Sequence, residues 1–112
     1  MKLSIITIAF NAADTIEDAV QSVLSQRQDG FELEYLVIDG ASKDATLEIL
    51  APYRDRLTLI SEPDKGIYDA MNKGISLASG DYVGILNADD LYAADDVLMR
   101  VAALFKSSGA AS

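Results

Sequence analysis

The stretch 3-LSIITIAFNAADTIEDAVQSVL-24 predicts an α/β fold, because the spacing of its apolar residues changes from that of a strand to that of a helix. Residues 3–10 are apolar or β-branched almost without interruption, as in a strand buried on both faces of a parallel sheet. From Ile16 to Gln26 the apolar residues recur at helical spacing. A buried strand followed directly by an amphipathic helix is the repeating unit of α/β proteins.

The same alternation of strand and helix continues along the rest of the chain. Apolar runs predict three further strands, and helical spacing predicts three further helices. Such an order indicates a mainly parallel sheet flanked by helices, joined by right-handed crossovers, and we expect the strand order 3-2-1-4. The expected strands are 35–38, 57–61 and 82–86, and the expected helices are 47–50, 67–78 and 97–105.

Local signals predict how some of these helices begin and pack. Asp14 and Glu17 resemble a capping box at the start of the first helix, with Asp in place of the usual Ser or Thr. Asp95 can cap the last helix, with Asp96 in its first turn. Gly74 lies inside a predicted helix, where Gly costs about 1 kcal/mol relative to Ala. Either close helix packing or a ligand contact explains that glycine, and packing is the more common cause.

The composition of the chain restricts its chemistry. It has 112 residues, with 18 acidic and 9 basic side chains and no cysteine or histidine. This length predicts one domain over residues 1–106, followed by a flexible small-residue tail over 107–112. The net charge of −9 argues against nucleic acid or an anionic membrane as a partner. Any metal binding or acid–base chemistry is left to carboxylates. The absence of cysteine and of a signal peptide pattern suits the cytoplasm.

Polar and aromatic residues follow the predicted strands at the edge where such folds bind ligands. In open parallel sheets ligands lie outside the carboxyl ends of the strands, near the point where the strand order reverses. With the order 3-2-1-4, that point lies between the first and fourth strands. Phe10 and the pair Asp89-Asp90 should then face each other across a crevice.

Asp89 and Asp90 have two interpretations. Two carboxylates suit Mg²⁺ or Mn²⁺, which prefer oxygen ligands and leave coordination positions open for phosphate groups. The simpler interpretation is a solvated turn before a helix, because Asp is common in turns. Taken alone, the doublet favours the turn.

Three other residues also allow a structural and a functional interpretation. Asp39 ends a strand and could accept hydrogen bonds from a nucleobase or ribose, or it could cap the loop 39–46. Phe10 could stack on a base or pack in the core. Lys65 could place an ammonium group beside phosphate or lie in a solvated turn.

Three segments together resemble the family 2 glycosyltransferases with a GT-A fold, especially bacterial members that build surface polysaccharides. The segments are 4-SIITIAFN-11, 37-VIDGASKDAT-46 and 62-EPDKGIYDAMNKGISLASGDYVGILNADD-90, of which the last is the most specific. The resemblance extends from residue 3 to about residue 105. It implies a Rossmann-like region that binds a nucleotide-sugar donor.

The resemblance also implies roles for individual residues. Phe10 stands where family members usually have a tyrosine that stacks on the nucleobase. Asn87 departs from the metal motif, which often begins with an aspartate, so Asp89 and Asp90 remain as the implied ligands of Mn²⁺ or Mg²⁺. One of the two would ligate the metal and the other would hold ribose or a metal-bound water. The implied nucleotide-binding residues are Thr7, Phe10, Asn11, Asp39, Lys65, Asn72 and Asp89.

The implied reaction is inverting transfer of a sugar from a nucleoside-diphosphate sugar, with UDP as the expected carrier, to a sugar or lipid-linked acceptor. In the family the carboxylate base follows the metal motif in the second half of the fold, and 1–112 contains no counterpart. We therefore expect this chain to be the donor-binding part of an enzyme and to transfer little sugar alone. A lipid-linked acceptor would place it at the inner face of the membrane. An exposed edge at strand 82–86 would favour homo-oligomers.

Two other classes of protein fit parts of the sequence. A nucleotide-binding module without transfer activity would explain the missing base. A flavodoxin-like receiver domain also gathers acidic residues at strand ends, but it needs a lysine at a late strand end. Lys106 lies instead in a predicted helix.

Overall fold

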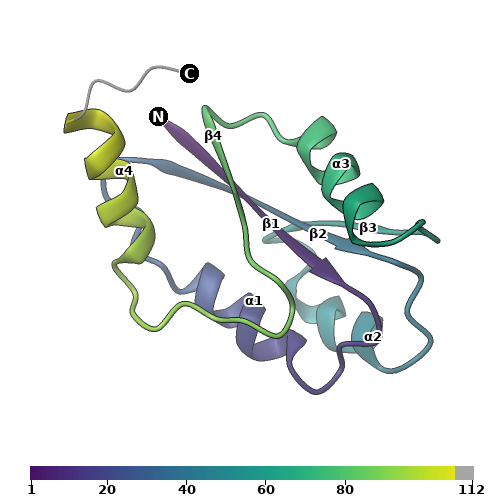
Figure 1. The fold of residues 1–112 in the computed structure, drawn as a ribbon. Helices are drawn as coiled ribbons and strands as arrows, with labels where there is room; N and C mark the ends of the chain where they lie inside the picture. The colour runs from purple at the N-terminus through teal and green to yellow at the C-terminus, as the bar shows by residue number, and fades with distance from the viewer. Residues whose placement is uncertain (108–112) are drawn as a thin grey trace.

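The computed structural model describes residues 1–107 and shows one sheet of four parallel strands (Figure 1). The strand order is β3-β2-β1-β4, which confirms the predicted α/β topology. All three strand pairs are parallel, so every strand ends at the same edge of the sheet. The strands are β1 (Lys2–Ala9), β2 (Glu32–Asp39), β3 (Thr58–Ser61) and β4 (Tyr82–Ile85).

Helices cover both faces of the sheet. Helix α3 packs on one face, and α1, α2 and α4 contribute to an apolar cluster on the other (Figure 1). The helices are α1 (Ile16–Leu24), α2 (Thr46–Leu50), α3 (Ile67–Leu77) and α4 (Val97–Ser107), with a 3₁₀ turn η1 (Ala51–Tyr53) after α2. Ser107, placed in the expected tail, is thus the last residue of α4. The rest of that tail, 108–112, lies outside the described residues.

The long apolar run of β1 is explained by burial on both faces. Leu3 and Ile5 pack into the larger cluster, which includes Val20 of α1 and Leu98 of α4. Ile6 packs on the opposite face in the smaller cluster. A strand between two helical layers needs apolar residues at successive positions, which is why its sequence does not alternate.

Gly74 is required by close packing between α3 and the sheet. A β-carbon placed on Gly74 would lie 2.7 Å from Cγ2 and 2.9 Å from Cδ1 of Ile6. Those distances are too short for carbon atoms in contact. The packing interpretation of this glycine is therefore confirmed.

Both predicted helix caps are wrong in detail. Thr15, not Asp14, precedes α1, and its side chain makes no capping hydrogen bond. The backbone carbonyl of Ala12 instead accepts hydrogen bonds from the N–H groups of Thr15 and Ile16. At the start of α4, the buried side chain of Gln26 accepts a hydrogen bond from Leu98 N–H at 3.0 Å, a role expected of Asp95. A nearby backbone carbonyl at α1 and a side chain distant in sequence at α4 thus replace the predicted caps.

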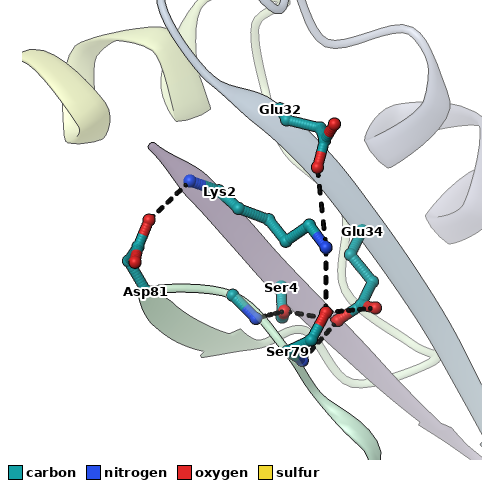
Figure 2. A network of polar contacts seen from close by, with 7 residues as sticks. Lys2, Ser4, Glu32, Glu34, Ser79 and Asp81 are labelled. Carbon is teal, nitrogen blue, oxygen red and sulfur yellow. Dashed lines mark hydrogen bonds and ion pairs between the residues drawn. The ribbon is translucent and has the colours of Figure 1, made fainter.

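A network of hydrogen bonds closes the amino end of the sheet, opposite the predicted crevice (Figure 2). Glu34 of β2 accepts hydrogen bonds from the Ser4 hydroxyl at 2.7 Å, and from Ser79 N–H and hydroxyl at 2.8 and 2.9 Å. Lys2 reaches the same Ser79 hydroxyl through its ammonium group. These bonds lower the pKa of Glu34, chiefly through the Ser79 N–H and the Ser4 hydroxyl. The network ties the segment before β4 to β1 and β2.

Strand β4 forms one edge of the sheet in the described part of the chain. It pairs only with β1, from Tyr82 to Ile85, and its side chains Val83 and Ile85 are 43% and 38% exposed. An exposed apolar edge can pair with a strand of another chain. Within residues 1–107, no helix is both long and apolar enough to cross a lipid bilayer.

Candidate functional site

An open hollow of about 760 Å³ lies at the carboxyl edge of the sheet. Its size falls within the range of roughly 300–1,000 Å³ that is usual for ligand pockets. The loops that follow all four strands contribute to its lining, as expected for an α/β sheet. The residues that matter below are Phe10, Asn11, Gly40, Asp64, Asn87 and Asp89.

Phe10 presents its ring to this hollow and is not a core residue. Its side chain is 61% exposed, although it directly follows the buried strand β1. The next residue, Asn11, has a positive φ of 48° and turns the chain away from the sheet. Asn11 N–H donates to the Ser42 hydroxyl at 2.7 Å, and Asn11 Oδ1 accepts from Lys43 N–H at 2.9 Å. Phe10 is thereby held by a loop with little freedom.

The loop after β2 holds the loop after β1 through further bonds. Ala12 N–H donates to the Thr46 hydroxyl at 2.8 Å, and Ala13 N–H donates to Asp44 at 3.1 Å. The Thr46 hydroxyl and N–H both donate to Asp44. The hydroxyl bond is the main cause of the lowered pKa of Asp44. The Phe10 side of the hollow is therefore a cross-linked pair of loops.

Asp39 lies beneath the hollow and does not line it. Its side chain is 0% exposed and accepts three hydrogen bonds, two from Ser42 and one from the Ser61 hydroxyl. The bonds to Ser42 measure 2.8 and 2.5 Å, and the bond to Ser61 measures 2.9 Å. Of the two interpretations drawn from the sequence, this geometry displays the one in which Asp39 caps its own loop.

Three other residues implied by the resemblance do not reach the hollow. Thr7 is fully buried, and its hydroxyl hydrogen bonds to the hydroxyl of Tyr35 at 2.7 Å. Lys65 is exposed in the loop before α3, and Asn72 borders a different shallow hollow beside Lys73. Their roles toward a nucleotide stay predictions.

The acidic pair follows β4, which lies next to β1 in the sheet. Asp89 and Asn87 line the hollow, whereas Asp90 lies beside it, and all three are exposed. Asp90 N–H donates to the Asn87 carbonyl at 3.0 Å, which closes a turn. Neither carboxylate accepts a hydrogen bond from a described residue. Both are therefore free to bind a ligand.

Sequence reasoning missed Asp64, which lines the hollow from the loop after β3. Asp64 is half-buried, and its Oδ1 accepts a hydrogen bond from Gly66 N–H at 3.1 Å. Gly66 has a φ of 117°, a conformation that favours glycine. The available signal was an aspartate two residues before a glycine at a strand end, a common turn in which the aspartate side chain bonds the backbone. In this loop the sequence suggested a possible ligand-binding role only for the neighbouring Lys65.

The acidic residues fit a cation that completes its shell with a bound ligand. Among residues 1–107, no three acidic side chains converge as a complete metal cage. Mg²⁺ and Mn²⁺ sites in nucleotide enzymes often use one or two carboxylates, together with water and phosphate oxygens. Asp89 and Asp90 have unbonded carboxylates beside an open hollow, so their chemistry matches such a site.

Known proteins with similar sequences are glycosyltransferases. An uncharacterized glycosyltransferase of Mycobacterium tuberculosis is 39% identical over 111 residues, which cover 98% of this chain and 42% of that protein. A putative teichuronic acid biosynthesis glycosyltransferase of Bacillus subtilis, TuaG, is 34% identical over 114 residues, covering 98% and 44%. The chain thus spans less than half the length of these relatives.

Solved structures share the fold. Residues 1–349 of Staphylococcus aureus TarS, in a complex with UDP-GlcNAc, superpose with a TM-score of 0.81 at 27% identity, and the match covers 96% of this chain and 32% of that TarS chain. The mannosyltransferase PcManGT of Pyrobaculum calidifontis, in a complex with GDP-Man and Mn²⁺, has a TM-score of 0.77 at 31% identity, covering 86% and 30%. The model of the glycosyl transferase family 2 matches residues 4–111. This chain therefore belongs to glycosyl transferase family 2.

Proposed function

We propose that the hollow binds a nucleoside-diphosphate sugar, with the base against Phe10 and the diphosphate at a divalent cation held by Asp89 and Asp90. One observation carries the proposal: the exposed aromatic ring of Phe10 and the exposed carboxylate of Asp89, which accepts no hydrogen bond from a described residue, line the same hollow, and Asp90 directly follows Asp89. Aromatic faces stack on nucleobases, and carboxylates bind hard cations. The complex of PcManGT with GDP-Man and Mn²⁺ supports the pairing of a nucleotide sugar with a cation, and the complex of TarS with UDP-GlcNAc supports the nucleotide sugar.

The proposed roles of the two acidic residues differ. Asp89 lines the hollow and would ligate the cation directly. Asp90 lies one residue further along the turn and would hold a metal-bound water or the ribose. When bound, Mn²⁺ or Mg²⁺ neutralises the negative charge that grows on the departing diphosphate. Asn87 lines the hollow as a neutral side chain, so it adds no charge to the site.

The proposed reaction is transfer of the sugar to an acceptor hydroxyl with inversion at the anomeric carbon, with UDP as the expected carrier. The hydroxyl would attack from the face opposite the diphosphate and lose its proton to a carboxylate base. No described residue is assigned as that base. Relatives named as glycosyltransferases of teichuronic acid biosynthesis and of PGL/p-HBAD biosynthesis support sugar transfer, and we propose a sugar or lipid-linked acceptor in the synthesis of a surface polysaccharide.

Calorimetric titration of the chain with UDP and GDP, with and without Mn²⁺, tests the proposal. We expect one nucleotide to bind with an affinity that rises when Mn²⁺ is present. Binding that is equal with and without the metal would contradict the assigned role of the acidic pair. The absence of binding by either nucleotide would contradict the proposed function itself.

A further inference from the structure

We propose that Ser22 and Gln26 are positioning residues for the divalent cation, because they hold the segment that carries the acidic pair in the form that binds it. The inference rests on the proposed function, since it assumes that Asp89 and Asp90 bind a cation. It assigns a role to two polar residues that do not line the hollow. Ser22 lies in α1, and Gln26 lies two residues after the end of this helix.

The acidic pair lies on a short bridge between two anchors. Ala88 N–H donates a hydrogen bond to the Ile8 carbonyl of β1 at 3.2 Å, and Tyr92 N–H donates to the Ser22 hydroxyl at 3.1 Å. The three residues between these anchors, 89–91, are all exposed. The position of the bridge therefore depends on what holds its two ends. The first anchor belongs to the sheet, whereas the second is made by a side chain of α1.

Gln26 reinforces the second anchor from a buried position. Its side chain is 4% exposed, and its amide N–H groups donate to the Ala94 carbonyl at 2.6 Å and to the Ser22 carbonyl at 3.1 Å. Its amide oxygen accepts a hydrogen bond from Leu98 N–H at 3.0 Å. An amide side chain carries both the donors and the acceptor that these bonds need. Gln26 thus joins α1, the segment after the acidic pair and the start of α4 at one buried point.

The Phe10 loop and the acidic pair are held by bonds from different elements. The loop after β2 holds the Phe10 loop, through the hydroxyl groups of Ser42 and Thr46. The bonds of Ser22 and Gln26 instead join the end of α1 to the segment after β4. Loss of the second set should therefore loosen the acidic pair and leave the Phe10 loop in place.

The physical reason is preorganisation of the cation site. A segment that is ordered before a ligand arrives binds it more tightly, because the cost of ordering does not fall on the binding step. Mg²⁺ in particular requires a near-octahedral arrangement of its oxygen ligands, so the position of each carboxylate matters. Without the bonds to Ser22 and Gln26, the bridge 89–91 would have to become ordered when the cation binds. That cost falls on binding with metal and not on binding of the nucleotide alone.

The experiment compares nucleotide affinity with and without Mn²⁺ by calorimetric titration of the chain. The ligand is UDP or GDP, whichever binds the wild type more tightly. Gln26→Met keeps a long side chain and removes all three of its bonds, and Ser22→Ala removes the acceptor of Tyr92 N–H. In both variants we expect the increase in affinity that Mn²⁺ produces to fall about threefold or more, the usual effect of one hydrogen bond. The affinity without metal should stay within about twofold of the wild type, because the Phe10 loop keeps its own bonds.

Two further variants separate positioning from general destabilisation. Ser22→Thr keeps the hydroxyl that accepts from Tyr92 N–H, so it should retain the increase of the wild type. Gly74→Ala disturbs the packing of α3 on the face of the sheet opposite α1. It should lower the free energy of unfolding and still retain the increase. A residue that only stabilised the fold would not produce this difference between the variants.

Three results decide the assignment. An increase with Mn²⁺ in Gln26→Met and Ser22→Ala that equals that of the wild type would overturn it, and so would an equally large loss in Ser22→Thr or Gly74→Ala. If Gln26→Met does not fold, as judged by circular dichroism, the two Ser22 variants decide alone. A wild-type chain whose nucleotide affinity does not rise with Mn²⁺ would instead contradict the proposed function.

Discussion

Three aspartates at the carboxyl edge of the sheet have very different surroundings. Asp39 is fully buried and accepts three hydrogen bonds, Asp64 is half-buried and accepts one, and Asp89 is exposed and accepts none from a described residue. A carboxylate whose lone pairs are occupied holds a loop in place, whereas one with open lone pairs can bind a ligand. The loop-capping geometry of Asp39 and the ligand-binding role proposed for Asp89 follow from these differences.

Replacing Phe10 by Ala should weaken binding of UDP with Mn²⁺ by about tenfold or more, because stacking on an aromatic ring contributes roughly 1–3 kcal/mol per base. Phe10→Tyr keeps the flat ring and should retain most of the affinity. Calorimetric titration measures both values. Phe10 is 61% exposed, so neither variant should lower the free energy of unfolding by much. Equal affinity of the wild type and Phe10→Ala would show that the ring does not carry the base.

Replacing Asp89 by Asn should abolish most of the increase in nucleotide affinity that Mn²⁺ produces, because a neutral amide oxygen attracts a divalent cation much less strongly than a carboxylate does. Asp90→Asn should reduce the increase less, since Asp90 lies beside the hollow rather than in its lining. Asp95→Asn removes the same charge outside the hollow and serves as the control. A loss of metal dependence in Asp95→Asn as large as in Asp89→Asn would indicate a general charge effect.

The residues around the hollow were only partly predictable. Phe10 and Asp89 were selected from their positions at strand ends and Asn11 through the family resemblance, and all three line the hollow. Whether Asp39 or Asp64 faces the ligand depends on hydrogen bonds with Ser42, Ser61 and Gly66, which come from other loops. Strand order predicts which loops meet but does not predict which way each side chain turns.

At the scale of elements, the contact between α3 and β1 depends on a single glycine. Gly74→Ala should lower the free energy of unfolding by about 1–3 kcal/mol, because the added carbon would overlap Ile6. The better helix propensity of Ala offsets only about 1 kcal/mol of this. Asn72→Ala, at an exposed position of the same helix, should be neutral or slightly stabilising. Urea unfolding measures the free energy of unfolding of both variants. A Gly74→Ala variant that is more stable than the wild type would contradict the packing account.

The hydrogen bonds to Glu34 predict a dependence of stability on pH. The pKa of Glu34 is lowered in the folded chain from about 4.5, so the ionised carboxylate favours folding. Its contribution is complete above about pH 4.5 and is lost as the pH falls through the lower folded pKa. Because the Glu34 carboxylate is partly exposed and solvent screens its charge, Glu34→Gln should reduce the free energy of unfolding at pH 7 by less than about 1 kcal/mol. The difference from wild type should shrink in strongly acidic solution.

Glu32→Gln provides the control for Glu34→Gln on the same strand. The side chain of Glu32 is 72% exposed and only pairs with Lys2 at 3.5 Å. Exposed ion pairs contribute little, so this variant should unfold like the wild type at every pH. Urea titrations at a series of pH values measure both. If the difference in free energy of unfolding between wild type and Glu34→Gln grows as the pH falls, the pH dependence has the opposite sign to the predicted one.

The types of the elements were easier to predict than their ends. Periodic apolar residues correctly located the four strands and four helices, because burial imposes that spacing on each element by itself. The caps were wrong because Gln26 and the Ala12 carbonyl compete for the same N–H groups as Asp95 and Asp14. Gln26 is distant from α4 in the sequence, and the Ala12 carbonyl is a backbone group that every residue type carries, so neither bond leaves a pattern of side chains in the sequence.

At the scale of the whole molecule, the exposed edge strand β4 should promote self-association. Val83 and Ile85 stand on this edge, where another chain could pair with the strand. Light scattering over a concentration series should show an apparent mass that rises for the wild type and stays constant for Val83→Lys. Leu104→Lys, at a 67% exposed position of α4, should behave like the wild type. A wild-type chain that is monomeric at all concentrations would count against the prediction.

The central claim is that the hollow between Phe10 and Asp89 holds a nucleoside diphosphate through a divalent cation. A crystal structure of the chain grown with UDP and Mn²⁺, with anomalous data for manganese, tests it most directly. We predict one manganese peak beside Asp89, between its carboxylate and the diphosphate, and a base stacked on the Phe10 ring. Manganese at Asp95 and Asp96 instead, or a nucleotide bound away from Phe10, would contradict the claim.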